Sequence, residues 1–302
     1  MKYFVFYVTL AKLLFLSALG RCQDPNEKRL LITEQSQNRI VIVNTKSATV
    51  DWQWEADSPF IHPGHIKWFV APSDAKIVNN SNWILMCASG GGVALIRVSD
   101  KKVLFYAFAG GNTHSIELLP DGNIVTASSD GNNLTVFAVD TPRLPGLKSS
   151  SIYVPFGHNI VWDKKRNILW SAGLNKMLKY RYNFIKDNPA LELIDSISYI
   201  HEHDEAHDLF PDYDKDALWL TDTKNVYIFD PEKSVAQVVP GIRIRNVKSI
   251  SSGPRGYPTI ISYPKERWWT DEIMSIDGKS IFRQNGWKIY KARWILPNHF
   301  SY

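Results

Sequence analysis

The stretch from Gly110 to Asn133, GGNTHSIELLPDGNIVTASSDGNN, contains two short strands and two turns. The first expected strand, residues 114–119, is mainly apolar but begins with His114, and the turn PDGN follows it. The second, residues 124–128, leads into the turn SDGN. Short apolar runs separated by Gly, Asn, Asp and Pro predict an antiparallel hairpin. The histidine at its start is the feature to look for elsewhere in the chain.

The same order of elements recurs along the sequence. HIKWFVAPSD begins at His65, HNIVWDKKRN at His158 and HDLFPDYDKD at His207, and each is followed by further strand-like runs. Two looser units place Lys248 (in VKSISSGPRG) and Lys291 (in KARWILPN) at the histidine position. The marked positions recur at roughly 40 to 50 residues, a period that with four strands per unit predicts a β-propeller.

The last unit is incomplete, and this predicts how the ring closes. KARWILPN has no following strands of its own, but the runs RLLITEQ, RIVIVNT and TVDWQWE near the N-terminus supply three. We therefore expect one all-β domain over residues 21–302, with six four-stranded blades and the C-terminal strand pairing with the N-terminal ones. Seven blades are the alternative, if residues 265–286 contain another.

In a propeller the loops that lead into the inner strands lie on one face, so the marked residues are expected to meet at one mouth of the channel. Imidazoles converging on rigid strands are typical ligands of Zn²⁺ or Mn²⁺. The predicted metal ligands are His65, His114, His158 and His207. Lys248 and Lys291 are predicted to attract an anionic group of a ligand. The alternative is that the histidines only form hydrogen bonds that lock the blades.

Other loops of this face add candidates. GIRIRN contributes Arg243 and Arg245 as substrate-binding residues. SYPKERWWTDE contributes Tyr263 as a catalytic candidate, and Trp268 and Trp269 as a platform for a sugar ring. HEHDEAHD places His203 where it could act as an acid or base above the mouth, although such a charged loop is more often only solvated.

Composition limits the setting and the partners. The segment 1–20 has the character of a signal peptide, which predicts an exported protein in the periplasm or outside the cell; a lipid anchor on Cys22 is the alternative. Loss of Lys2 and Lys12 with this segment lowers the net charge from +5 to about +3, too little to indicate nucleic-acid binding. No later segment is long and apolar enough to span a membrane, and a monomer is expected.

The runs GNTHSIELLPDGNIVTASS, GHNIVWD and HDLFPD resemble an uncharacterised family of bacterial secreted propellers, domain of unknown function 6528. This resemblance implies the fold and an exported setting, but no reaction. A looser architectural similarity links the chain to propeller polysaccharide lyases, in which histidines at the mouth bind a metal or act as a base. We therefore expect a metal-assisted lyase or hydrolase acting on an acidic carbohydrate or glycoside. The alternative is a non-catalytic propeller that binds glycan or protein through the same face.

Overall fold

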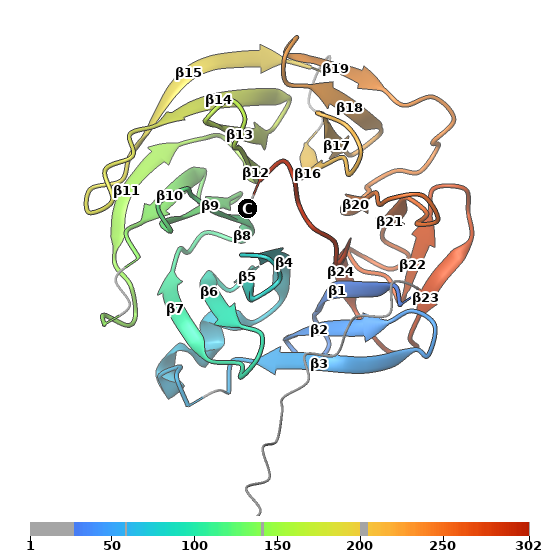
Figure 1. Cartoon of the computed structure of the whole chain (residues 1–302), viewed down its shortest axis with the longest axis horizontal. Helices are drawn as coiled ribbons and strands as arrows, with labels where there is room; N and C mark the ends of the chain where they lie inside the picture. Colours follow the sequence, from blue (N-terminus) through green and yellow to red (C-terminus); the bar gives the residue numbers. More distant parts are fainter. Residues whose placement is uncertain (1–26, 58, 140–141, 200–204, 302) are drawn as a thin grey trace, which may run out of the picture.

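A computed structural model describes residues 27–57, 59–139, 142–199 and 205–301. In this part of the chain, six antiparallel sheets of four strands each are arranged around a central axis (Figure 1). This confirms the predicted six-bladed propeller, and residues 265–286 contain no seventh blade. They hold a loop and the two outer strands of the sixth sheet.

The first three blades contain the following strands. Blade 1 has β24 (Ile289–Trp294), β1 (Arg29–Glu34), β2 (Arg39–Asn44) and β3 (Thr49–Glu55). Blade 2 has β4 (Pro72–Val78), β5 (Trp83–Ala88), β6 (Gly92–Arg97) and β7 (Val103–Phe108). Blade 3 has β8 (Thr113–Leu118), β9 (Ile124–Ser128), β10 (Asn133–Phe137) and β11 (Lys148–Tyr153).

The other three blades follow the same order from the inside outwards. Blade 4 has β12 (Gly157–Asp163), β13 (Ile168–Gly173), β14 (Lys176–Tyr182) and β15 (Leu191–Ser198). Blade 5 has β16 (Ala206–Pro211), β17 (Leu218–Asp222), β18 (Val226–Asp230) and β19 (Val235–Val238). Blade 6 has β20 (Ser249–Ser251), β21 (Ile260–Ser262), β22 (Glu272–Ser275) and β23 (Ser280–Arg283).

The ring closes within blade 1, as predicted. The C-terminal strand β24 pairs antiparallel with β1, so Leu30 opposes Trp294 and Ile32 opposes Ala292. The inner strand of this blade therefore comes from one end of the chain and the three outer strands from the other. Closure thus gives β1 a partner on its inner side, and β24 becomes the inner edge strand of blade 1.

The apolar core lies between neighbouring blades. Each inner strand contributes at least one residue to an apolar cluster shared with an adjacent sheet, because side chains alternate along a strand. Six such positions, one in each inner strand, are Ala75, Ile116, Ile160, Leu209, Ile250 and Ala292. Asp74, Asp208 and Arg293 are next to three of these positions and contact one another across the axis, which is how the fold brings distant parts of the sequence together.

One short helix interrupts the pattern. The segment leading into β4 forms the 3-10 helix η1 (Pro63–Phe69), and the His62 imidazole accepts a hydrogen bond from the Gly64 amide at 3.1 Å. The helix packs on the β5–β6 turn, where a Cβ atom on Gly90 would lie 2.6 Å from the Trp68 carbonyl oxygen. Glycine is therefore required at this close approach.

The two ends of the channel differ. Residues 295–301 leave β24 and cross the end at which the inner strands finish (Figure 1). Phe300 packs there among apolar residues of blades 4 and 5, and its carbonyl accepts a hydrogen bond from the Lys164 amide at 3.1 Å. The opposite end, where the inner strands begin, is the predicted mouth. Within the described residues, no helix is long and apolar enough to cross a membrane.

Candidate functional site

The inner strands share an irregularity at the mouth. In β4, β8, β12 and β16, pairing with the second strand skips one residue, as in a β-bulge. In β24 the register shifts between Ile32 and Glu34, and we assign Tyr290 to this place because the Thr33 hydroxyl forms two hydrogen bonds with the backbone of Lys291. Lys248 directly precedes β20 and takes the same place in blade 6. We call these six residues the mouth ring: Ser73, His114, His158, His207, Lys248 and Tyr290.

Three of the four predicted histidines meet in this ring. The imidazoles of His114 and His158 stack with centroids 4.2 Å apart, and His207 meets His158 edge-on at 5.6 Å. The Lys248 ammonium donates a hydrogen bond to Nε2 of His207 at 3.0 Å. On the other side, the Tyr290 hydroxyl lies 3.2 Å from Nδ1 of His114. Four consecutive blades thus contribute imidazole, imidazole, imidazole and ammonium.

Burial determines the protonation of the ring. Desolvation holds the pKa of His114 and His158 well below the usual range, and the charge of Lys291 lowers both further. Desolvation and the adjacent Lys248 lower the pKa of His207 to about 3. The pKa of Lys248 falls to about 8, because burial and the charge of Lys291 outweigh the attraction of Glu205. At neutral pH the ring therefore carries three neutral imidazoles beside one ammonium.

The predicted metal site does not fit this geometry. The ring planes of His114 and His158 are within 11° of parallel, and the lone pairs of an imidazole lie in its plane. Two stacked rings therefore cannot direct their lone pairs at one ion. Among the residues that the structure describes, no group of three or more His, Cys, Asp or Glu side chains could hold a metal.

Both ring nitrogens of His158 lack a hydrogen-bond partner in the described structure, although the residue is only 3% exposed. A neutral imidazole has one N–H donor and one acceptor nitrogen, and burying either unpaired costs free energy. Phe156 contributes to this burial, because its ring lies 5.0 Å from the imidazole of His158. The mouth ring therefore contains a buried imidazole whose donor and acceptor are both unsatisfied.

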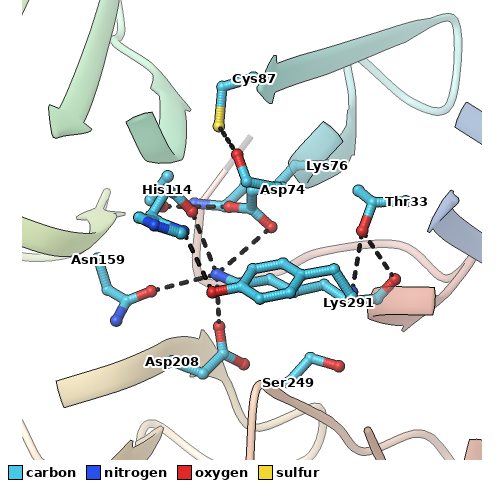
Figure 2. A network of polar contacts seen from close by, with 12 residues as sticks. Thr33, Asp74, Lys76, Cys87, His114, Asn159, Asp208, Ser249 and Lys291 are labelled. Atoms are coloured by element: carbon cyan, nitrogen blue, oxygen red, sulfur yellow. Dashed lines mark hydrogen bonds and ion pairs between the residues drawn. The ribbon is translucent and has the colours of Figure 1, made fainter. Parts of the chain in front are cut away.

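Lys291 does not lie in the ring, as the sequence alignment had placed it, but one residue deeper. Figure 2 shows its ammonium between acidic and amide side chains from three other blades. It lies 3.2 Å from an Asp208 carboxylate oxygen, 3.9 Å from one of Asp74 and 3.3 Å from the Asn159 amide oxygen. Lys291 is therefore buried below the place where the prediction put it. Its positive charge is balanced by the carboxylates of Asp74 and Asp208.

A second buried cation completes this inner layer. Arg293 contacts Asp208 through two nitrogen–oxygen pairs, at 2.5 and 2.6 Å, and reaches Asp74 at 3.4 Å. Burial alone would raise the pKa of Asp208, but the charges of Arg293 and Lys291 lower it to about 2. Two cations thus balance two carboxylates beneath the mouth ring. Figure 2 shows the side chains of Asp74 and Asp208 directed at Lys291 from opposite sides.

His65 does not reach the mouth, and the strand predicted to begin with it is wrong. It lies in η1, where its ring stacks on Trp68 at 3.7 Å and Nδ1 is 3.3 Å from the Tyr106 hydroxyl. Pro63 favours a helical first turn, and the inner strand begins only at Pro72. The residue in the histidine position of blade 2 is therefore Ser73.

The remaining candidates are dispersed. Arg243 and Arg245 are exposed in the segment between β19 and β20, and neither forms an ion pair with a described residue. Tyr263 is half-buried against the apolar cluster of blade 6. His203 and Cys22 lie outside the described residues, as does the expected signal peptide.

The tryptophan pair occupies the β21–β22 loop. Trp268 is 50% exposed and donates a hydrogen bond from Nε1 to Gln35 at 3.1 Å, whereas Trp269 is half-buried. Their rings meet edge to face, with centroids 4.9 Å apart. The loop joins a second to a third strand and so lies on the mouth face, as expected.

Sequence reasoning missed the inner layer and two members of the ring, Ser73 and Tyr290. A signal was present: the inner strands carry charges in otherwise apolar runs, as in SDAKIV, SIEL, HDLF and KARW. Charged residues are rarely fully buried unless they are paired. Such residues on four of the inner strands could therefore have predicted a paired network along the axis.

Comparisons with known proteins agree with this architecture. No curated protein matches the chain significantly. A crystal structure of a protein of unknown function from Bacteroides caccae is similar over 90% of this chain and 100% of its own, with a TM-score of 0.55 and 15% identity. A protein from Lactobacillus plantarum is similar over 89% of this chain and 99% of its own, with a TM-score of 0.58 and 11% identity. At such identities these likenesses show the fold alone.

The sequence itself is more specific. A family described as a family of unknown function, DUF6528, matches residues 20–302, which include the whole described propeller. The three histidines of the mouth ring and both lysines lie within the matched residues. The chain belongs to this family.

Proposed function

We propose that the protein binds an acidic carbohydrate at the mouth of the channel, as a ligand-binding propeller that needs no metal. The observation that carries this proposal is Lys248. Its ammonium has a neutral histidine as its partner and forms no ion pair with a described carboxylate. By contrast, the two cations of the inner layer are fully matched by Asp74 and Asp208.

The neighbours of Lys248 favour a sugar acid over a simple ion. A carboxylate of the ligand would pair with the ammonium, and the sugar hydroxyls, each both donor and acceptor, would match neutral imidazoles. His158 has such a pair of unsatisfied nitrogens, which are buried beside Phe156 and would become available to a ligand when that side chain moves. The exposed Arg243 and Arg245 would add long-range attraction for an anion. The signal peptide expected at residues 1–20 would place this binding outside the cytoplasm.

Calorimetry with tetragalacturonate and neutral maltotetraose would test the proposal. We expect the wild-type protein to bind only the acidic sugar. Lys248→Ala should weaken binding at least tenfold, whereas Lys248→Arg keeps the charge and should retain it. Lys101→Ala, a change of an exposed lysine away from the ring, is the control. Equal binding of both sugars, unaffected by Lys248→Ala, would show that the proposal is wrong.

The half-buried position of Lys248, 3.0 Å from a ring nitrogen of His207, supports a second candidate function, an elimination reaction without metal. With a pKa of about 8, roughly a tenth of Lys248 is the neutral amine at pH 7. Such an amine could remove the proton from the carbon next to a uronate carboxylate. The carbon–oxygen bond of the glycosidic link would then break as a carbon–carbon double bond forms, and the leaving oxygen would take a proton from water at the mouth. Ultraviolet absorbance of an unsaturated product, lost in Lys248→Arg, would distinguish this lyase from a binding protein.

A further inference from the structure

The exposed indole of Trp268 is held in place from two sides. Its Nε1–H donates to the Gln35 side chain, and the edge-to-face contact with Trp269, at an interplanar angle of 87°, fixes its orientation. A tryptophan that is half exposed yet already oriented presents a flat apolar surface with little entropy left to lose on binding. Pyranose rings bind to such surfaces through their apolar face.

Two cations without a described carboxylate partner lie against the neighbouring ring, Trp269, which itself contacts Trp268. The Lys288 ammonium lies 4.6 Å and the Arg267 guanidinium 5.7 Å from the Trp269 ring, and neither forms an ion pair with a described residue. Lys265 of the same loop, by contrast, is paired with Glu272 and Asp271. Glu266, between Lys265 and Arg267 in the sequence, is an exposed acid. The two unpaired cations, Arg267 and Lys288, outnumber it, so the net unpaired charge beside the tryptophans is positive.

This loop borders the part of the mouth ring that has no histidine. Lys288 lies two residues before Tyr290 of the ring. Gln35, which holds Trp268, also donates a hydrogen bond to the carbonyl of Pro72 at 3.0 Å, next to Ser73 of the ring. Trp268 is therefore connected through Gln35 to the residue next to Ser73 of the ring, and Lys248 lies in the same blade as the Trp268 loop. Figure 1 shows the strands involved side by side, with β24 and β1 next to blade 6.

We infer that Trp268, Arg267 and Lys288 form a second, outer subsite for an acidic sugar unit, on the same face as the mouth. The ligand is then an oligosaccharide with several acidic units: one pairs with Lys248, and another stacks on Trp268 with its carboxylate towards Arg267 and Lys288. This inference rests on the proposed function. It adds that an extended acidic chain binds more tightly than its single unit.

The test compares chain lengths. Calorimetry would measure galacturonate and tetragalacturonate binding to wild type, Trp268→Ala, Arg267→Ala and Lys248→Ala. Trp268→Ala should weaken tetragalacturonate binding at least tenfold and Arg267→Ala severalfold, and both should leave galacturonate binding unchanged. Lys248→Ala should weaken both ligands. Tyr153→Ala, which removes another exposed aromatic side chain, should have no effect.

The two ideas fail in different ways. If tetragalacturonate binding depends on Lys248 but not on Trp268 or Arg267, the outer subsite does not exist and the proposed function stands. If wild type binds neither acidic sugar, both ideas are overturned. If Trp268→Ala weakens galacturonate as much as tetragalacturonate, the two residues belong to one site, and the second subsite is again wrong.

Discussion

The mouth ring and the layer beneath it each contain a lysine, but only the lysine of the lower layer has carboxylate partners. Lys248 and Lys291 come from neighbouring blades and differ by one step along the axis. Lys291 is 1% exposed and lies between two carboxylates, whereas Lys248 is half-buried beside a neutral histidine. What separates a structural cation from one available to a ligand is thus the identity of its neighbours. Asp74 and Asp208 lie one layer below the mouth ring, where they pair with Lys291 and Arg293 and not with Lys248.

The largest effect should come from removing the deeper cation. Lys291→Met leaves Asp74 and Asp208 with Arg293 alone, and breaking a buried ion pair on one side costs roughly 3–5 kcal/mol. Lys248→Met breaks no ion pair with a described residue, so less than about 1 kcal/mol is expected. Urea unfolding of both variants measures the difference. Equal losses would contradict the distinction between the layers.

Low pH should destabilise the protein, because the three histidines of the mouth ring are buried in their neutral form. His114, His158 and His207 have pKa values below the ordinary value of about 6.5, so as pH falls through 6.5 the unfolded chain binds protons that the folded protein does not. Stability therefore decreases as pH falls below 6.5, by up to about 1.4 kcal/mol per pH unit for each histidine.

Unfolding curves at pH 7.5, 6 and 5 would measure this dependence. His207→Gln should reduce the slope, because it removes one of the three titrating groups. His62→Gln, a change of an exposed histidine in the loop before η1, serves as the control. A slope that is identical in His207→Gln and wild type would show that His207 is not buried in its neutral form.

The smallest expected effect concerns ligand binding at alkaline pH. Because the pKa of Lys248 is about 8, the ammonium is lost as pH rises above that value, and anion binding should fall. At pH 9.5 we expect at least a tenfold loss of affinity for tetragalacturonate relative to pH 7. Lys248→Arg should abolish this loss, since arginine stays charged. A wild-type affinity that is constant from pH 7 to 9.5 would exclude Lys248 as the anion-binding group.

The repeat predicted the blades well because each hairpin carries its own turn residues. The run PDGN between β8 and β9 is one example, and the missing strands of the last unit predicted the closure by β24. The errors arose where local sequence imitates the repeat. HIKWFV has the histidine and the apolar residues of an inner strand, but Pro63 and Gly64 start a helix, and the true strand begins seven residues after His65, at Pro72.

The site was harder to predict, because the bulge shifts the register by one residue. KARW aligns naturally with its lysine on the histidines, yet the Thr33 hydroxyl bonds to the Lys291 backbone, and Tyr290 is the residue whose hydroxyl meets His114. A one-residue shift moves a side chain to another face of the strand. Ring orientation is likewise set by packing between blades. For this reason, the stacking of His114 on His158 could not be inferred from their spacing.

The closure of the ring by β24 also sets the order in which the protein can mature during synthesis. The cations that neutralise Asp74 and Asp208 are Lys291 and Arg293, which are among the last residues of the described chain to leave the ribosome. Until they arrive, blades 2 and 5 carry acids with no counter-charge, and β1 has no partner on its inner side. A product truncated before residue 289 would thus lose both its closing strand and its charge balance, and would remain open to proteolysis.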